Sequence, residues 1–386
     1  MHEPRTTRLT WGAGAGVLAA LSLGVGLLAG TAALGSTRVH HPSPAPFISR
    51  FHTITTVAST VPSLGSGEPG NGDVNPYGVA VVPRSTGSLI AGDVLVSNFN
   101  DSSNLQGTGR TIMQISPTGT ANVFANLGTQ VSGPVGLTTA LSVFGNGDVV
   151  VGSLPTTDGT AATATAGALY VLNSTGKLIE TIQGGDINGP WDMTAYDGGG
   201  FGVLFVTNVL NGTVAGGGQT VDKGTIVRVV LDFSSRAPKV EQELVIGRGF
   251  EEATNATALV LGPTGVGLAP NGTLYVADTM TNRIAAIPDA LFRVTPSIIG
   301  NTVSRGGFLS APLGLAMAPN GDVLTVNGNN GYIVETTPTG NQVAWVYLDQ
   351  SGSPPGAGVL FGLAVQPGNK GIYFVDDDLN TLQLFH

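Results

Sequence analysis

Short apolar runs recur along most of the chain, and turns rich in glycine, asparagine and threonine separate them. Two stretches are nearly identical, because residues 269–277 read APNGTLYVA and residues 318–326 read APNGDVLTV. Each contains an Asn-Gly pair, which favours a tight turn with positive φ at both central positions. Apolar residues lie on both sides of that turn, so each stretch predicts a β-hairpin.

The same hairpin pattern recurs six times. Its first strand reads NPYGVAV at 75, GPVGLTT at 133, GPWDMTA at 189, GPTGVGL at 262, APLGLAM at 311 and VLFGLAV at 359. The fourth residue of each marker is Gly78, Gly136, Asp192, Gly265, Gly314 or Gly362, at spacings of 58, 56, 73, 49 and 48 residues. Further apolar runs, such as TIMQIS at 111 and QVAWVYL at 342, predict third and fourth strands. Helical periodicity is absent. The pattern therefore predicts an all-β, six-bladed β-propeller of four-stranded blades.

The two ends of this repeat region predict how the ring closes. The sixth repeat ends with TLQLF at 381 and supplies three strands, whereas the segment FHTITTVAS at 51 belongs to no repeat. We expect this N-terminal segment to add the outer strand of the last blade, so that the ring has no open edge. Residues 51–386 then form one propeller domain. The stretch at 239–255 is longer and more charged than its counterparts, which predicts an outer strand with an insertion in the third repeat.

The repeats resemble the NHL repeat, within the six-bladed propeller superfamily that includes the SMP-30/gluconolactonase-like proteins. The fourth repeat carries the resemblance through Pro263, Gly265, Asn271-Gly272, Leu274 to Asp278, and Asn282-Arg283-Ile284. The other five repeats share the marker and the second strand of this motif but lack the Asn-Arg pair that follows them. The resemblance covers the whole predicted domain and implies its fold. It says little of function, since propellers carry many unrelated activities.

A different kind of sequence precedes the repeats. Arg5 and Arg8 stand before an apolar run at 11–35, which ends in small residues. This arrangement is typical of a secretory signal peptide, and the run is also long enough for a retained signal-anchor helix. Both alternatives place the propeller outside the cytoplasm, secreted or anchored, with membrane contact only through this segment if it is not cleaved. Residues 36–50 read as a proline-containing linker.

Composition excludes several function classes. Charged residues make up 11% of the chain, the net charge is −9, and no basic stripe occurs, so no nucleic-acid partner is expected. The chain has no cysteine and therefore no disulfide. Its five histidines are His2, His40, His41, His52 and His386, and all of them lie outside the span from the first marker to the last strand. This excludes histidine-based zinc sites and Ser-His-Asp catalysis within the blades. We assign no catalytic residue.

Oxygen-bearing side chains remain as candidates. The second strands of the six repeats end at Asn98, Ser153, Asn208, Asp278, Asn327 and Asp376, which should ring one face of the disc. Such oxygens could bind Ca²⁺ or another divalent cation. Through the resemblance, a lactonase-type metal would take its ligands from Asp192, Asn208, Asp278 and Asp376, although the family's Glu-Gly-Pro opening is missing. Alternatively each side chain caps its own turn, with Asp278 pairing with Arg283.

Asp192 is the clearest departure from the repeat pattern. Five repeats place glycine at this position, and the third places Asp192 directly after Trp191. Near the central channel, a carboxylate beside an aromatic ring could bind a metal or a sugar hydroxyl. The alternative is a local hydrogen bond to the backbone at the start of the strand. Long loops follow the second strands of the first three repeats, and short loops follow those of the last three. All of these loops should emerge on one face of the disc. We expect a ligand against the half of that face that carries the short loops, which we call the low half.

Two functions fit these features. The first is an extracytoplasmic binding or scaffold module for an unidentified protein or glycan, without catalysis and without a required cofactor. The alternative is a divalent-metal-dependent hydrolase or lactonase of the SMP-30/gluconolactonase type. The two differ in one geometric respect: a metal enzyme needs several of the candidate oxygens to converge on one point.

Overall fold

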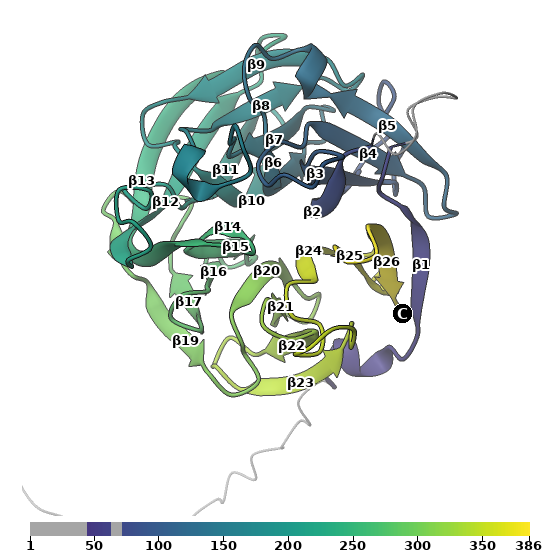
Figure 1. Ribbon diagram of the computed structural model, residues 1–386, viewed down its shortest axis with the longest axis vertical. Coiled ribbons are helices and arrows are strands. Elements are labelled where there is room, and N and C mark those ends of the chain that lie inside the picture. Colours follow the sequence, from purple (N-terminus) through teal and green to yellow (C-terminus); the bar gives the residue numbers. More distant parts are fainter. Residues whose placement is uncertain (1–44, 63–71) are drawn as a thin grey trace, which may run out of the picture. The chain divides into compact units, whose positions relative to one another are not determined.

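Each of the six repeats forms an antiparallel sheet, and the sheets stand around a central axis (Figure 1). The computed structural model describes residues 45–62 and 72–386. The predicted signal peptide or anchor and residues 36–44 of the predicted linker lie outside these ranges. Within the described ranges, regular helix is limited to three short 3-10 turns, η1 (Ile48–Arg50), η2 (Leu127–Thr129) and η3 (Ala161–Thr163). The predicted six-bladed all-β fold is therefore confirmed.

The strands of a blade follow one another from the axis to the rim. The first and second blades are β2 (Val74–Val81), β3 (Val94–Asn100), β4 (Thr111–Ile115) and β5 (Ala121–Asn126), then β6 (Leu137–Val143), β7 (Val149–Ser153), β8 (Ala168–Leu172) and β9 (Leu178–Gln183). The fourth and fifth are β15 (Pro263–Leu268), β16 (Leu274–Asp278), β17 (Arg283–Ile287) and β19 (Asn301–Arg305), then β20 (Pro312–Met317), β21 (Val323–Asn327), β22 (Tyr332–Thr336) and β23 (Gln342–Tyr347).

The third blade is larger than the others, as its long repeat predicts. It contains β10 (Pro190–Asp197), β11 (Phe201–Asn208), β12 (Val221–Asp232), β13 (Lys239–Asn255) and β14 (Leu259–Leu261). The stretch at 239–255 is one continuous outer strand, and its last residues turn back to pair with β14. A short strand from the fourth repeat, β18 (Ser297–Ile298), pairs with β13 in parallel. The third and fourth blades are thus joined at the rim.

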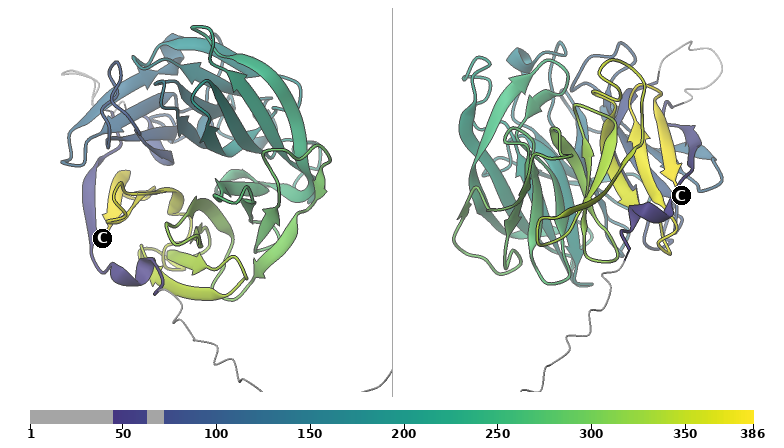
Figure 2. Two further views of the ribbon diagram at one scale, coloured as in Figure 1. Left: turned by 180° about the vertical axis from the view of Figure 1, so that it is seen from behind. Right: turned by 90° about the horizontal axis from the view of Figure 1, so that it is seen from below.

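The ring closes as predicted. The sixth blade is β24 (Leu360–Val365), β25 (Ile372–Asp376), β26 (Thr381–Phe385) and β1 (Ile54–Ser59). Strand β1 pairs antiparallel with β26, and Ile54 lies opposite Phe385; the two strands lie side by side in Figures 1 and 2. Packing begins before β1, because the backbone N–H groups of Phe47 and Ile48 donate to the Glu335 carboxylate at 2.7 and 2.8 Å. The last residues of the predicted linker therefore pack on the fifth blade.

The six markers have a common structural role. In every innermost strand the pairing register shifts at the marker; in β10, for example, Pro190 pairs with Asn208 and the next paired residue is Met193. At the bulges of Gly265, Gly314 and Gly362 the backbones of neighbouring blades meet. A Cβ on Gly314 would lie 1.9 Å from the Phe361 carbonyl oxygen, and one on Gly362 would lie 2.1 Å from the Tyr77 carbonyl oxygen. Glycine is therefore required at these positions because no side chain fits between the strands.

One buried ion pair anchors the fourth blade. The Arg283 and Asp278 side chains are both about 1% exposed, and Nη2 of Arg283 lies 2.7 Å from Oδ2 of Asp278. Arg283 also donates to the Thr302 hydroxyl at 3.0 Å and to the Ile299 carbonyl. The predicted pairing of Asp278 with Arg283 is present, and the arginine also holds the segment that precedes β19.

We expect Arg283→Met to destabilise the protein by about 3–5 kcal/mol, because it leaves the Asp278 carboxylate buried without its counter-charge. The double variant Arg283→Met/Asp278→Asn should recover part of this loss, since no uncompensated charge then remains. Urea denaturation of the two variants and the wild type measures both values. A loss below about 1 kcal/mol for the single variant would show that the pair does not anchor the blade.

Candidate functional site: the central channel

Large side chains close one end of the central channel. Tyr77, Trp191, Leu313 and Phe361, which precede the fourth marker residue in four repeats, are each at most 3% exposed and belong to one core cluster; we call them the channel plug. The rings of Tyr77 and Phe361 stack with centroids 3.9 Å apart. Nε1 of Trp191 donates to the Val260 carbonyl at 3.1 Å, so the segment from the end of β13 through β14, which we call the third-repeat insertion, covers the plug. We call this the plug end of the channel.

The long loops of the first three repeats complete this closure. Leu154 and Val209, at the bases of two of these loops, are buried in the same cluster as the plug. The loops of the first two repeats also contact one another, because the Thr156 N–H donates to the Gly107 carbonyl at 2.8 Å. Against the low half of this face lies a hollow of about 170 Å³, between the third-repeat insertion and residues such as Leu313 and Asn329. Ligand binding in that hollow stays a prediction.

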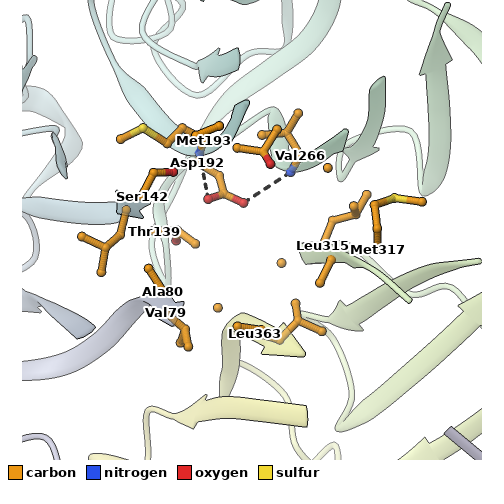
Figure 3. A pocket seen from close by; sticks show the side chains of 18 of the residues that line it. Val79, Ala80, Thr139, Ser142, Asp192, Met193, Val266, Leu315, Met317 and Leu363 are labelled. Atoms are coloured by element: carbon orange, nitrogen blue, oxygen red, sulfur yellow. Dashed lines mark hydrogen bonds between the residues drawn. The ribbon is translucent and has the colours of Figure 1, made fainter. Parts of the chain in front are cut away.

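A cavity of about 340 Å³ occupies the channel beyond the plug. The C-terminal halves of all six innermost strands line it, mainly with apolar side chains such as Val266, Leu315 and Leu363 (Figure 3). The polar side chains in the wall are Thr139, Ser142, Asp192 and Thr194. A largely apolar cavity with a few polar groups is the usual form of a small-molecule site. We call the end at which the innermost strands finish the mouth end.

Asp192 contributes the one ionisable side chain to this wall. Its Oδ1 accepts the backbone N–H of Met193 at 2.8 Å, and its Oδ2 accepts that of Val266, in the next blade, at 3.3 Å (Figure 3). Its own backbone is held by the Thr207 hydroxyl at 3.0 Å. The predicted local backbone hydrogen bond is therefore present, and a second bond links the third blade to the fourth. At the equivalent positions Gly265, Gly314 and Gly362 the backbones of two blades come into direct contact, whereas here a carboxyl group lies between them.

The surroundings of Asp192 favour its neutral form. The residue is 7% exposed, and burial raises the pKa of its carboxyl well above the ordinary 3.8, although the two backbone N–H groups oppose this shift. No cation faces it among the residues that line the cavity. Thr139, also in the wall, is 4% exposed, and its hydroxyl has no hydrogen-bond partner among the described residues. A protonated acid and a free hydroxyl can both donate to a ligand oxygen.

The ring of oxygen-bearing residues lies at the plug end, because the last residues of the second strands pair with the first residues of the innermost ones. Each side chain makes contacts near its own position: Asn98 donates to the Thr60 carbonyl at 2.9 Å, Ser153 accepts the Gly136 N–H at 3.1 Å, Asn208 accepts the Asn188 N–H at 3.2 Å, Asp278 binds Arg283, Asn327 donates to the Phe308 carbonyl at 2.8 Å, and Asp376 accepts the Leu379 N–H at 2.9 Å. The structure places these residues equivalently without bringing them together.

The four proposed metal ligands likewise do not form a common site. Asp192 lines the cavity, whereas Asn208, Asp278 and Asp376 lie at the plug end with the partners given above. Over the described ranges, no three aspartate, glutamate or histidine side chains gather as a metal site would require. The residues present therefore do not fit a lactonase-type metal, and no chemical step is derived through one.

The acidic turn after β25 carries two further perturbed carboxyls. Burial raises the pKa of Asp376 to about 6, and burial together with the charges of Asp376 and Asp378 raises that of Asp377 to about 8. With its amide oriented to satisfy both neighbours, Asn75 donates to Asp377 and accepts from Asn100 at 3.0 Å. Asp377 is thus held in a polar network between the sixth and first blades.

The sequence singles out Asp192 and Trp191, but the structure places Trp191 in the plug and not in the wall of the cavity. The sequence does not single out Thr139 or the Val266 N–H. The break in the glycine pattern marks Asp192, whereas no equivalent signal distinguishes Thr139 from the many other threonines. Thr139 lines the cavity because of the way the blades are arranged around the axis. The repeat pattern in the sequence does not contain that information.

We expect stability to fall as the pH rises from about 4 to about 8. The carboxyls of Asp376, Glu252 and Asp377 have pKa values of about 6, 7 and 8, all raised chiefly by burial. An acid whose pKa is higher in the folded state binds more protons there than in the unfolded chain, so deprotonation favours unfolding within this window. Melting temperature against pH tests this, and Asp377→Asn should flatten the upper part of the curve. A melting temperature that rises across the window would contradict the assignment.

No protein-family model and no curated protein matches this chain. Several solved structures share its architecture. A protein assigned as a gluconolactonase is 13% identical with a TM-score of 0.53, covering 89% of this chain and 96% of its own. The calcium-binding regucalcin from Agrobacterium tumefaciens is 14% identical with a TM-score of 0.53, covering 86% and 95%.

A PQQ-bound aldose sugar dehydrogenase from Streptomyces coelicolor is 13% identical with a TM-score of 0.50, covering 86% of this chain and 98% of its own. At these identities the likeness extends to the fold. Within the described ranges, no helix is long and apolar enough to cross a membrane. The chain therefore has the six-bladed propeller fold that gluconolactonase- and regucalcin-type proteins also adopt.

Proposed function

We propose that this protein is an extracytoplasmic binding propeller whose channel cavity holds a small carbonyl-bearing molecule of the sugar-lactone class. One observation carries the proposal: a buried carboxyl, that of Asp192, lies in the wall of a cavity of about 340 Å³. That volume is at the lower end of the range typical of small-molecule sites. The proposal narrows the predicted glycan-binding function to one place and one size of ligand.

Asp192 would act as a hydrogen-bond donor. Its Oδ2 makes the longer of the two backbone contacts, at 3.3 Å, and is therefore the oxygen better placed to carry a proton. A neutral acid in an apolar wall can donate to a carbonyl oxygen, and the Thr139 hydroxyl offers a second donor. The apolar side chains would cover the less polar faces of the ligand and exclude water. The polar groups would fix its orientation.

We expect the affinity for a lactone such as gluconolactone to depend on Asp192 through its proton. Asp192→Ala should weaken binding about tenfold, the value of one net hydrogen bond, whereas Asp192→Asn keeps a neutral donor and should retain most of the affinity. Wild-type binding should weaken as the pH rises through the raised pKa of Asp192, and the asparagine variant should show no such slope. Isothermal titration calorimetry at several pH values measures both effects.

The exposed Asp186→Ala serves as the control, because it removes a carboxyl of the same repeat that lies outside the cavity. If Asp192→Ala and Asp186→Ala bind lactones alike, the cavity is not the binding site. If no lactone binds to the wild type, the ligand class is wrong.

Metal-dependent lactone hydrolysis is the second candidate function. It is favoured by the fold shared with a gluconolactonase and with calcium-binding regucalcin, but the described residues offer no common metal site. We expect purified protein to contain no stoichiometric metal and to melt at the same temperature in EDTA and in excess Ca²⁺. Elemental analysis and thermal denaturation measure this. Bound metal together with a lower melting temperature in EDTA would favour the hydrolase over the binding function.

A further inference from the structure

Large apolar side chains are exposed around the mouth end of the propeller. In the loop that follows β17 in the fourth repeat, Phe292 is 84% and Val294 75% exposed. Other blades add apolar residues at their mouth-end turns: Ile90 at 57%, Tyr196 at 40% and Phe201 at 44%. Phe292 and Val294 lie two residues apart on one loop, and large apolar side chains exposed together in this way are candidates for an interaction surface.

Strand register assigns the loop to the mouth end. Ile287, the last residue of β17, pairs with Leu274, and Leu274 pairs with Leu268, which lines the cavity. The loop follows directly, and the Ala290 N–H donates to the Gly272 carbonyl in the turn between β15 and β16. Phe292 therefore lies close to the rim at the end where the cavity opens.

The loop is held firmly rather than loosely. Arg228, 4% exposed, donates to the carbonyls of Ala290 and Leu291 at 3.0 and 2.8 Å. Arg283 binds the Ile299 carbonyl, and the Ile299 N–H donates to the Arg248 carbonyl at 2.9 Å. Ile299 has a φ of 52°, a conformation that a β-branched residue adopts only under constraint from its surroundings. Two buried arginines thus fix a segment that turns its apolar side chains to the outside.

The N-terminal segment enters the propeller at the same end. Ile54 pairs with Phe385, Phe385 pairs with Ile372, and Ile372 pairs with Val365, which lines the cavity. The chain described before β1 therefore approaches from the mouth side. In the sequence, an apolar run without charge at 11–35 precedes it by a short stretch. A membrane-held run there would bring the mouth end toward the bilayer.

We propose that the mouth end docks on a lipid surface, with Phe292 and Val294 inserted at the interface. Few apolar side chains insert in such a contact, so on its own it is weak, and stable attachment takes two signals; here the second is the apolar run at 11–35. The loop carries one acidic and one basic residue, Asp289 and Arg293, so it has no net charge to repel an anionic surface, although the whole chain has a net charge of −9. In this orientation the cavity opens toward the membrane.

The test uses the full chain reconstituted in vesicles of phosphatidylcholine and phosphatidylglycerol. Because the chain has no cysteine, Phe292→Cys carries a single environment-sensitive fluorophore without further changes. Leu379→Cys is the matched control, since Leu379 is an apolar residue 58% exposed at the plug end. We expect lipid-borne quenchers to reduce the emission at position 292 severalfold more than at position 379. Both variants should melt like the wild type, because each replaces an exposed side chain.

Equal quenching at the two positions would overturn the proposal. So would shielding at position 292 that depends on protein concentration and not on lipid, since it would identify a second copy of the chain as the partner. As a further measurement, the fluorophore is attached to Ile90→Cys, at an exposed position of the mouth end. Lipid-borne quenchers should reduce its emission when the loop is wild type. They should no longer do so when the loop carries Phe292→Ser/Val294→Ser. Unchanged quenching at position 90 would show that the loop does not determine the orientation.

Discussion

The close approach of neighbouring innermost strands at the marker glycines is the constraint on which this propeller depends. At Gly314 and Gly362 a Cβ atom would collide with the carbonyl oxygen of the next blade, so backbone rather than side chain sets the distance between these blades. This tight inner ring leaves only a narrow channel. In four repeats the residue before the fourth marker position packs into one shared core cluster, and these four side chains, Tyr77 and Phe361 among them, close the channel.

At Asp192 the innermost strands of the third and fourth blades are joined through a side chain. In place of a direct backbone contact, its carboxyl accepts N–H groups from its own strand and from Val266 in the next blade. The substitution keeps the two blades joined but introduces a polar group where the other repeats have none. Burial makes the charged form costly, so the group serves better as a neutral acid than as a carboxylate. The aspartate that replaces glycine at this position therefore both links the two blades and places a carboxyl group in the cavity wall.

The fold followed from the sequence because it depends on local and repeated signals. Asn-Gly turns, the marker and the unmatched segment at 51 predicted the blades and their closure, which β1 and β26 confirm. The site was harder to predict. Periodicity places Asn98 and Asp278 at equivalent positions, but it does not say that each is engaged by its own surroundings. The plug depends on contacts between distant segments, such as the bond from Trp191 to Val260, and no local pattern encodes these.

The plug end of the channel is covered and the mouth end is not, because the repeats differ in the lengths of their loops. The long loops and the third-repeat insertion all emerge at the plug end, where Leu154, Val209 and Val260 fill the core. The mouth end lacks such cover, since the turns there join the first and second strands or the third and fourth. The long loop after β17 packs against the third blade instead, through Arg228 and β18. The third repeat therefore acts at both ends of the channel. Its residues around β14 cover the plug end. At the rim, its strands β12 and β13 hold the loop of the fourth repeat.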